Sequence, residues 1–594
     1  MEYETNRLIP PLLASLLFGC GPAPTAPDAQ DETNPSLGKA DAIDRDRDGE
    51  CPGGCSVGSV CHTLVCVTEP GPPRLVSPLS GALVSGTPMF HWLPGEDSTG
   101  ATLELCDTPD CSTVIQTLRG ADWAAVDEAL PAGTYFVRGF GQRDTDDTMV
   151  HGVDPSETWM IEARPERPTT ISGFATQPDF DRDGNPELVI HNPFDTTSTR
   201  RASWSRYEYT DGSLLRQQKH AIIDAGLRPM LVNAGDVDGD GFPDLALSSD
   251  GAITWFRGSP AGLREDGHRV ELAGGNVSSL APLGDVNGDG YADLIAGHLR
   301  QQGSSGTPAR ATLLVGGPQG PSIADAPLGP PGDFVAASGA GDFNGDGFAD
   351  VLVRGTQGFA MHSARVHVGS PDGPIAEPVA IVEGWIGHAR AVGDVNGDGY
   401  ADLGVLYNGS GIGSHRAEIR YGSPGEPDGS PSVDPLEYVN PDGSITACQE
   451  RLPNGEPIRS CLLWPAGDVN GDGHDDVLLV AQFDDHGDGA LWLYQGSPEG
   501  VASRPSHVLS VPEGDPSAFG RAVAPIGDWN RDGRDELAVS ASYARDIVDH
   551  TRSTRAAVYV FQFSEQFDVL RRLSSGSHIG KNDRFGETLA GTHP

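Results

Sequence analysis

Seven copies of one acidic nine-residue loop lie between residues 179 and 536 of this chain. Two copies are identical, GDVNGDGYAD at 284–293 and 393–402, and three more are near-identical, at 235–244, 341–350 and 467–476. The first and last copies, DFDRDGNPEL at 179–188 and GDWNRDGRDE at 527–536, follow the pattern more loosely. Each copy places oxygen-bearing side chains at positions 1, 3, 5 and 9, counted from its first aspartate, and a glycine at position 6. The fold must therefore place all seven loops in equivalent structural positions.

The loop pattern predicts calcium binding. Calcium takes six to eight oxygen ligands in a flexible cage, and an acid at every second position of a tight loop points carboxylates inward. In the copy at 394–402 the side-chain ligands are Asp394, Asn396, Asp398 and Asp402, and the carbonyl group of Tyr400 completes the set. The closing acid at position 9 and the strand-like ADLGVL that follows distinguish the loop from an EF-hand.

A simpler interpretation is that Asp-Gly pairs are good turn residues. It accounts for one loop but not for like charges converging seven times, since such charges about 4 Å apart repel by roughly 4 kcal/mol. We therefore predict about seven structural calcium ions. Their ligands are Asp179, Asp181, Asp183, Glu187, Asp236, Asp238, Asp240, Asp244, Asp285, Asn287, Asp289, Asp293, Asp342, Asn344, Asp346, Asp350, Asp394, Asn396, Asp398, Asp402, Asp468, Asn470, Asp472, Asp476, Asp528, Asn530, Asp532 and Glu536.

The spacing of the loops predicts an all-β architecture. Their first aspartates are 49 to 74 residues apart, and a second motif recurs in phase, as GSPAG at 258–262, GPQG at 317–320, GSPDG at 369–373, GSPG at 422–425 and GSPEG at 496–500. Each unit reads as strand, acidic loop, strand, connection, strand, glycine-rich turn and strand. Repeats of this length with four strands are typical of a β-propeller, and we predict seven blades over residues 168–594.

The repeats resemble FG-GAP repeats, which form the seven-bladed propeller of integrin α subunits and occur in bacterial surface proteins. Phe519-Gly520 stands nine residues before Asp528, and Trp385 takes the same place before Asp394. A further Phe585-Gly586 lies close to the last residue. From the sequence, its strand either closes the ring or marks a truncated eighth blade. The resemblance implies that calcium is structural.

Residues 72–163 have a different character, with short alternating strands between proline and glycine turns. They resemble a fibronectin type III or immunoglobulin-like β-sandwich. The resemblance implies that Trp92 is the buried core tryptophan and that Tyr135 and Val137 belong to a late strand.

The nine cysteines predict an oxidised, exported protein with four disulfide pairs and one cysteine apart. The paired residues are Cys51, Cys55, Cys61 and Cys66 in a knot at residues 44–67, then Cys106 with Cys111, and Cys448 with Cys461. The pairing within the knot is open, and zinc is the alternative, although the spacing fits structural zinc poorly. Asp44, Asp46 and Asp48 imitate the acidic loop, but Pro52 stands at position 9, so we expect a turn or a weak site.

The first twenty residues resemble a bacterial lipoprotein signal peptide. An apolar run from Leu8 to Phe18 is followed by Leu17-Phe18-Gly19-Cys20, which implies cleavage after residue 19 and a lipid on Cys20. Residues 21–43, rich in proline, alanine and aspartate, are predicted to be a disordered tether. We expect an outer-membrane or cell-surface lipoprotein, or a secreted protein, that contacts the membrane only through its lipid anchor.

The formal net charge of −44 excludes a nucleic-acid partner, which needs a basic surface. The sequence lacks HExxH, GxSxG and phosphate-cradling glycine motifs, and we predict no catalytic residues. His298, His474 and His550 are interpreted as solvated loop residues. The function predicted is adhesion or ligand binding; the alternatives are a glycan-binding lectin and a propeller-based polysaccharide-degrading enzyme.

Long insertions at 298–310, 408–416, 483–489 and 543–555, together with 425–461, fall on the propeller face opposite the acidic loops. We expect a protein or polysaccharide ligand there, because long loops on a rigid scaffold commonly bind partners. The hypothesis of an acidic polysaccharide rests on the arginines of that face, Arg300, Arg310, Arg451, Arg545, Arg552 and Arg555.

Overall fold

The computed structural model describes residues 59–165 and 178–590 with gaps, of which the longest are 193–201, 223–228, 300–307, 408–415, 425–432, 437–459, 483–489, 511–517, 543–556 and 575–587. The described residues form strands and no helix. Several predictions fall outside these residues: the signal peptide with Cys20, the tether, Cys51, Cys55, Cys448, His550, and the arginines of the insertions other than Arg310. No helix in this part of the chain is long and apolar enough to cross a membrane.

The described chain begins with a two-stranded hairpin in which β1 (Ser59–His62) pairs with β2 (Val65–Thr68). Its register places Cys61 opposite Cys66. The pairing of the four clustered cysteines stays a prediction.

Residues 74–163 form two β-sheets that pack face to face. The larger sheet has the order β4-β11-β9-β6-β7, with β10 paired to β9, and the smaller has the order β3-β5-β8. The bounds are β3 Arg74–Ser77, β4 Ala82–Val84, β5 Met89–Leu93, β6 Gly100–Cys106, β7 Val114–Gly120, β8 Trp123–Ala125, β9 Gly133–Asp144, β10 Met149–Pro155 and β11 Trp159–Ala163.

Alternating side chains from both sheets form one core. Trp92 of β5 is 2% exposed, and its indole Nε1 donates to the carbonyl of Ala121 over 3.1 Å. Tyr135 and Val137 both belong to β9, and the Tyr135 hydroxyl donates to the carbonyl of Pro131 over 2.9 Å. A tyrosine that hydrogen-bonds to the backbone just upstream is a feature of immunoglobulin-like sandwiches. The fibronectin type III or immunoglobulin-like class of the domain stays a prediction.

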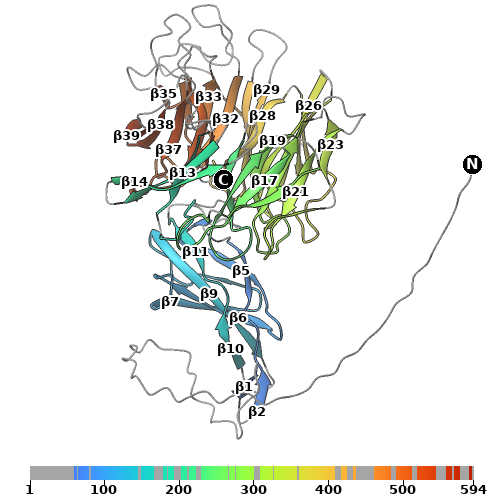
Figure 1. Cartoon of the computed structure of the whole chain (residues 1–594), viewed down its shortest axis with the longest axis vertical. Helices are drawn as coiled ribbons and strands as arrows, with labels where there is room; N and C mark the ends of the chain where they lie inside the picture. Colours follow the sequence, from blue (N-terminus) through green and yellow to red (C-terminus); the bar gives the residue numbers. More distant parts are fainter. Residues whose placement is uncertain are drawn as a thin grey trace, which may run out of the picture. The chain divides into compact units, whose positions relative to one another are not determined.

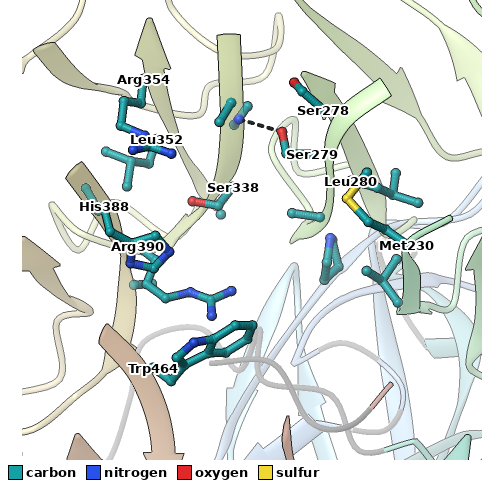
Figure 2. A pocket seen from close by; sticks show the side chains of 18 of the residues that line it. Met230, Ser278, Ser279, Leu280, Ser338, Leu352, Arg354, His388, Arg390 and Trp464 are labelled. Atoms are coloured by element: carbon teal, nitrogen blue, oxygen red, sulfur yellow. Dashed lines mark hydrogen bonds between the residues drawn. The ribbon is translucent and has the colours of Figure 1, made fainter. Parts of the chain in front are cut away.

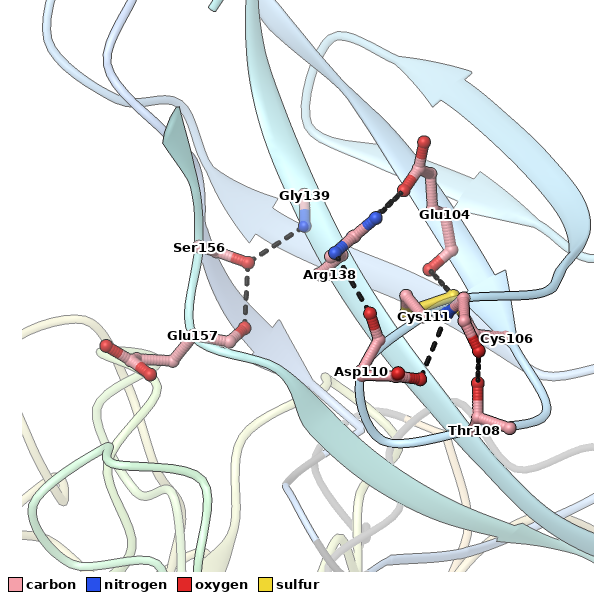
Figure 3. Close-up of a disulfide and its surroundings, with 10 residues drawn as sticks. Glu104, Cys106, Thr108, Asp110, Cys111, Arg138, Gly139, Ser156 and Glu157 are labelled. Atoms are coloured by element: carbon pink, nitrogen blue, oxygen red, sulfur yellow. Dashed lines mark hydrogen bonds and ion pairs between the residues drawn. A yellow bond between two sulfur atoms is a disulfide. The ribbon is translucent and has the colours of Figure 1, made fainter. Parts of the chain in front are cut away.

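A disulfide closes the connection from β6 to β7 (Figure 3). The Cα atoms of Cys106 and Cys111 are 5.1 Å apart, and the bond is buried against Phe136 and Met160. Arg138 of β9 reaches across this end of the sheet and donates to the Glu104 carboxylate at 2.8 Å. The covalent link therefore fixes a long hairpin at its turn.

The rest of the chain forms seven sheets of consecutive strands in its described part (Figure 1). The first contains β12 Glu187–Asn192, β13 Ala202–Thr210 and β14 Ser213–Ile222, together with the last strand, β40 Thr588–Ala590. The second contains β15 Leu231–Gly235, β16 Asp244–Ser249, β17 Ala252–Phe256 and β18 His268–Glu271. The third contains β19 Val277–Gly284, β20 Asp293–His298, β21 Ala309–Val315, β22 Ser322–Ile323 and β23 Leu328–Gly332.

The remaining four sheets repeat the same order. The fourth contains β24 Phe334–Gly341, β25 Asp350–Gln357, β26 Ala360–His367 and β27 Ala380–Gly384, and the fifth contains β28 Ile386–Gly393, β29 Asp402–Tyr407, β30 Arg416–Arg420 and β31 Val433–Leu436. The sixth contains β32 Ser460–Gly467, β33 Asp476–Gln482, β34 Ala490–Tyr494 and β35 His507–Ser510. The seventh contains β36 Ala518–Pro525, β37 Leu537–Ser542, β38 Ala557–Phe563 and β39 Phe567–Ser574. One strand from each of the seven sheets lines a common cavity, so the sheets form a ring, which is a β-propeller.

The two ends of the repeat region meet in one sheet. β40 pairs antiparallel with β12, with Ala590 opposite Val189 and Leu589 opposite Ile190. The strand that follows Phe585-Gly586 therefore closes the ring. It does not begin an eighth blade.

Apolar side chains fill the spaces between neighbouring sheets. Phe519, the aromatic residue of the Phe-Gly motif, is 1% exposed and meets Phe561 edge-to-face, with ring centroids 5.9 Å apart. The same core contains Leu478 and Val480 of the preceding sheet. Trp385, at the equivalent place, lies outside the described side chains.

Candidate metal sites

Six of the acidic loops join the innermost strand of a blade to the next strand, whereas the first loop directly precedes β12, whose inner neighbour is β40. In five blades the inner strand ends at a glycine that pairs with the position-9 aspartate, as Gly393 of β28 does with Asp402 of β29. The loop is therefore the tight end of a β-hairpin. This pairing brings position 9 of the loop close to position 1.

Backbone N–H groups of each loop orient the carboxylates at its positions 1 and 5. In the loop at 394–402, Asp394 accepts hydrogen bonds from the N–H groups of Asp398 (3.1 Å) and Gly399 (2.8 Å), and Asp398 accepts one from Tyr400 (3.0 Å). The equivalent bonds to the position-1 carboxylate recur in the loops that begin at Asp285, Asp342, Asp468 and Asp528.

The position-9 carboxylate links the acidic loop to the glycine-rich turn of the same blade. One oxygen of Asp402 accepts from the N–H group of Val395, and the other accepts from Gly422, both over 2.9 Å. Equivalent bonds join Asp244 to Gly258, Asp293 to Gly316, Asp350 to Gly369, and Asp476 to Gly496. The two sequence motifs recur in phase because one side chain holds both.

Two glycines, at positions 4 and 6, adopt left-handed backbone conformations. In the loop at 342–350, Gly345 has φ 73° and Gly347 has φ 90°. A Cβ atom on Gly345 would lie 2.1 Å from Cε1 of Tyr400, the position-7 aromatic residue of the next loop. The sequence analysis assigned a turn to position 6 only. The structure adds position 4, where the first and last loops carry Arg182 and Arg531 at φ 56° and 62°.

Successive loops are hydrogen-bonded to one another around the ring. The N–H group at position 8 of one loop donates to the position-1 carbonyl of the preceding loop, as Ala401 does to Asp342 (3.0 Å) and Asp535 to Asp468 (2.9 Å). The serine of the glycine-rich turn donates to the position-2 carbonyl of the preceding loop, as Ser423 does to Phe343 (3.1 Å). The acidic loops thus connect neighbouring blades.

Burial leaves these carboxylates in need of a cation. Desolvation, followed by repulsion from neighbouring aspartates, raises the pKa of Asp350 to about 8 and that of Glu536 to about 9. The pKa values of Asp285 and Asp394 rise to about 6, again chiefly through burial. A divalent ion among the carboxylates would favour their charged forms and oppose this shift.

The structure brings the predicted ligands together most closely in three loops. Carboxylate oxygens lie within 4.8 Å of one another in the groups Asp179–Asp181–Glu187, Asp236–Asp238–Asp244 and Asp528–Asp532–Glu536. Glu208 of β13 forms a similar group with Asp181 and Asp183. Sequence spacing did not indicate Glu208, which lies 21 residues beyond the first loop and carries no motif of its own.

Arginines reach into the first two loops. Arg206 of β13 donates from Nη1 to Asp181 (2.7 Å) and to Glu187, and Arg257 pairs through Nε with Asp238 (2.7 Å). A guanidinium group among the carboxylates competes with a metal ion for the same oxygens. The residues of the first loop therefore fit calcium less well than those of the other loops.

The histidine interpretation needs one correction. His298, expected to be a solvated loop residue, is 1% exposed at the end of β20, and its Nε2 shares a 2.8 Å hydrogen bond with the Thr312 hydroxyl. His474 is half-buried at position 7 of its loop. Arg310 donates to the carbonyl of Gly329 over 3.4 Å.

Comparison with known proteins agrees with this architecture. A family model described as FG-GAP-like repeat matches residues 179–247, 236–296, 342–405 and 468–539. This chain carries an FG-GAP, integrin-α-like β-propeller. Each matched segment begins at one acidic loop and ends in the strand that follows the next acidic loop.

Integrin α subunits are among the curated relatives. Integrin alpha-IIb of Mus musculus is 32% identical over 173 residues, which are 27% of this chain and 15% of the relative. Integrin alpha-PS2 of Drosophila melanogaster is 30% identical over 179 residues, covering 28% and 12% of the two chains. The chain thus spans less than a fifth of the length of these relatives.

A solved structure, the beta-propeller domain of the Trilobed protease from Pyrococcus furiosus, covers 65% of this chain and 84% of that chain. The two share 9% sequence identity, with a TM-score of 0.30. A superposition this loose says nothing about the number of blades in this chain or about its chemistry.

Proposed function

We propose that this chain is an exported adhesion or ligand-binding module whose FG-GAP propeller is stabilised by structural calcium, about one ion for each acidic loop. The observation that carries the proposal is the repeated set of carboxylates at positions 1, 5 and 9, joined by the oxygen-bearing residue at position 3, with the position-9 carboxylate buried in every loop. Calcium, when bound, would supply the positive charge that these oxygens lack. The first loop would bind it most weakly, because Arg206 already donates to Asp181 and Glu187.

Residues of the sandwich, and the residue that directly follows its last strand, contact the acidic loops. The Ser80 hydroxyl donates to the carbonyl of Gly241 (2.7 Å), and Arg164 pairs with Asp535 (2.7 Å). The guanidinium of Arg74 lies over the ring of Tyr291, 4.8 Å from its centroid. These contacts support the opposite face as the place for a partner.

Export is supported by the disulfide between Cys106 and Cys111, since such bonds persist in oxidising compartments. We propose that Cys20 carries a lipid and that residues 21–43 act as a tether. The ligand would be a protein or a polysaccharide. The integrin-type propeller favours binding over catalysis, and the lectin differs from adhesion only in the class of ligand.

Binding to arrays of polysaccharides and extracellular proteins tests this function with the full chain in calcium buffer. We expect retention on a restricted set of ligands, lost when Asp398→Asn and Asp472→Asn disrupt two calcium loops. Asp372→Asn is the matched control, because Asp372 is exposed in a glycine-rich turn. Release of unsaturated sugar ends from a charged polysaccharide would instead indicate a lyase, and binding to none of the ligands would contradict the proposal.

A further inference from the structure

The inner strands of the propeller surround a cavity of about 420 Å³ (Figure 2). Every inner strand contributes to its wall, through residues such as Leu231, Ser279, Ala337, Arg390, Trp464, Val523 and Leu589. The cavity is therefore part of the channel along the propeller axis. Its volume lies in the range of small-molecule binding sites.

The charge of this cavity opposes the charge of the chain. Arg354, His388, Arg390 and Arg521 line it, and none of its lining residues is an aspartate or glutamate. The whole chain has 84 acidic residues against 40 lysines and arginines. That the charged side chains of the described lining are all basic is unexpected in so acidic a protein, and it indicates a local requirement for positive charge.

Three nitrogens of the cavity wall are buried and have no hydrogen-bond partner among the residues that the structure describes. They are Nδ1 of His388, Nη1 of Arg390 and Nε1 of Trp464, which lie on the adjacent inner strands β28 and β32. Figure 2 shows the Arg390 guanidinium above the Trp464 indole, and its Cζ atom is 3.9 Å from the ring centroid. Most buried polar groups in proteins have a partner, and an unmet donor is costly.

Arg390 remains charged although it is desolvated. Desolvation lowers the pKa of Arg390 to about 10, which is still well above neutral pH. The pKa of His388 lies well below its ordinary value of 6.5, first because of burial and then because Arg390 and Arg354 repel its protonated form. At neutral pH a charged Arg390 guanidinium therefore lies beside a neutral imidazole ring in the cavity.

We propose that the axial channel binds a small oxyanion, preferably the carboxylate of an organic acid, through Arg390 and Arg354 with Trp464 as a further donor. A guanidinium group matches the two oxygens of a carboxylate. Met230 and Leu280 give the opposite wall an apolar surface for the body of such a ligand. The proposal goes beyond the proposed function, because it involves neither the acidic loops nor the insertions.

Titration calorimetry on the full chain in calcium chloride tests the site with three probes: sodium glucuronate, its neutral counterpart glucose, and sodium sulfate. We expect one glucuronate per chain and no glucose. Arg390→Gln should weaken glucuronate binding by at least about tenfold, since charge-assisted hydrogen bonds to the anion are lost. The matched control is Arg269→Gln on β18, where the exposed arginine pairs with Glu271.

The sulfate probe distinguishes the source of the oxyanion. Binding of sulfate alone, lost in Arg390→Gln, would support the oxyanion site and identify an inorganic ion as its occupant. Failure of both anions to bind, or binding that Arg390→Gln leaves unchanged, would overturn the proposal.

A second measurement does not depend on the choice of ligand. Without ligand, Arg390→Met should raise the melting temperature, because it removes a desolvated charge for which the described part of the chain offers no counter-ion. If the arginine served only to pack against Trp464, the same change would lower the melting temperature. That result would also overturn the proposal.

Discussion

Arg164 donates a 2.7 Å hydrogen bond to Asp535, and the two side chains are only 3% and 2% exposed. Arg164 directly follows β11, the last strand of the sandwich, and Asp535 is position 8 of the last acidic loop. The second oxygen of Asp535 accepts from the backbone N–H group of Asp468, over 3.1 Å, in the preceding loop. One carboxylate therefore joins the sandwich to two neighbouring blades.

Replacing Arg164 by methionine should destabilise the chain by about 3–5 kcal/mol, because Asp535 would keep a buried charge without its ion pair. Urea unfolding measures this change. The control is Arg269→Met, which breaks the exposed pair with Glu271 and should cost less than about 1 kcal/mol. Equal losses for the two variants would show that the Arg164 contact does not couple the sandwich to the propeller.

Removing calcium should lower the melting temperature by tens of degrees. Each site adds about 2.7 kcal/mol when free calcium is 100 times its dissociation constant, and the loops also connect neighbouring blades. Scanning calorimetry before and after chelation measures the effect, and metal analysis of material purified without chelator should return at least about five equivalents. A transition that does not move on chelation would refute structural calcium.

The sequence predicted the acidic loops and the propeller because both depend on local repetition. Asp394, Asp398 and Asp402 recur with fixed spacing, and the strands beside them follow from the same repeat. The pairing of β40 with β12 was left open, since strand partners so far apart along the chain have no local signal.

The missed residues share a physical reason. Arg206 and Glu208 reach the first loop from a neighbouring strand, and Arg390 reaches the axial channel only because seven blades converge there. His298 was misjudged because its burial depends on the strand that packs over it. Such contacts exist only after the ring has closed, and no motif marks them.

The metal-free protein should lose stability as the pH rises from 7 to 9.5. Burial raises the folded-state pKa of Asp350 to about 8 and that of Glu536 to about 9, whereas the unfolded chain releases these protons near pH 4. Because the folded pKa is the higher one, the stabilisation is present at low pH and is lost as the pH rises through 8 and 9.

Melting temperatures of dialysed, calcium-free protein at pH 7, 8 and 9.5 measure this slope. Glu536→Gln should make it shallower, because the variant has one fewer proton to lose. Saturating calcium should flatten the slope, since the bound ion keeps the carboxylates ionised throughout. A melting temperature that climbs with pH in the absence of calcium would contradict the assigned burial of these acids.

Gly345→Ala should destabilise the chain more than Gly347→Ala, although both glycines lie in one loop and both have positive φ angles. A Cβ atom on Gly347 meets no atom within 4 Å, so that variant reports backbone strain alone, about 1–2 kcal/mol. A Cβ atom on Gly345 would also overlap the ring of Tyr400, which adds about 1–3 kcal/mol of overpacking. Urea unfolding in saturating calcium measures both variants. In a Tyr400→Ala background the difference between them should disappear, and its persistence would mean that the contact between successive loops does not constrain position 4.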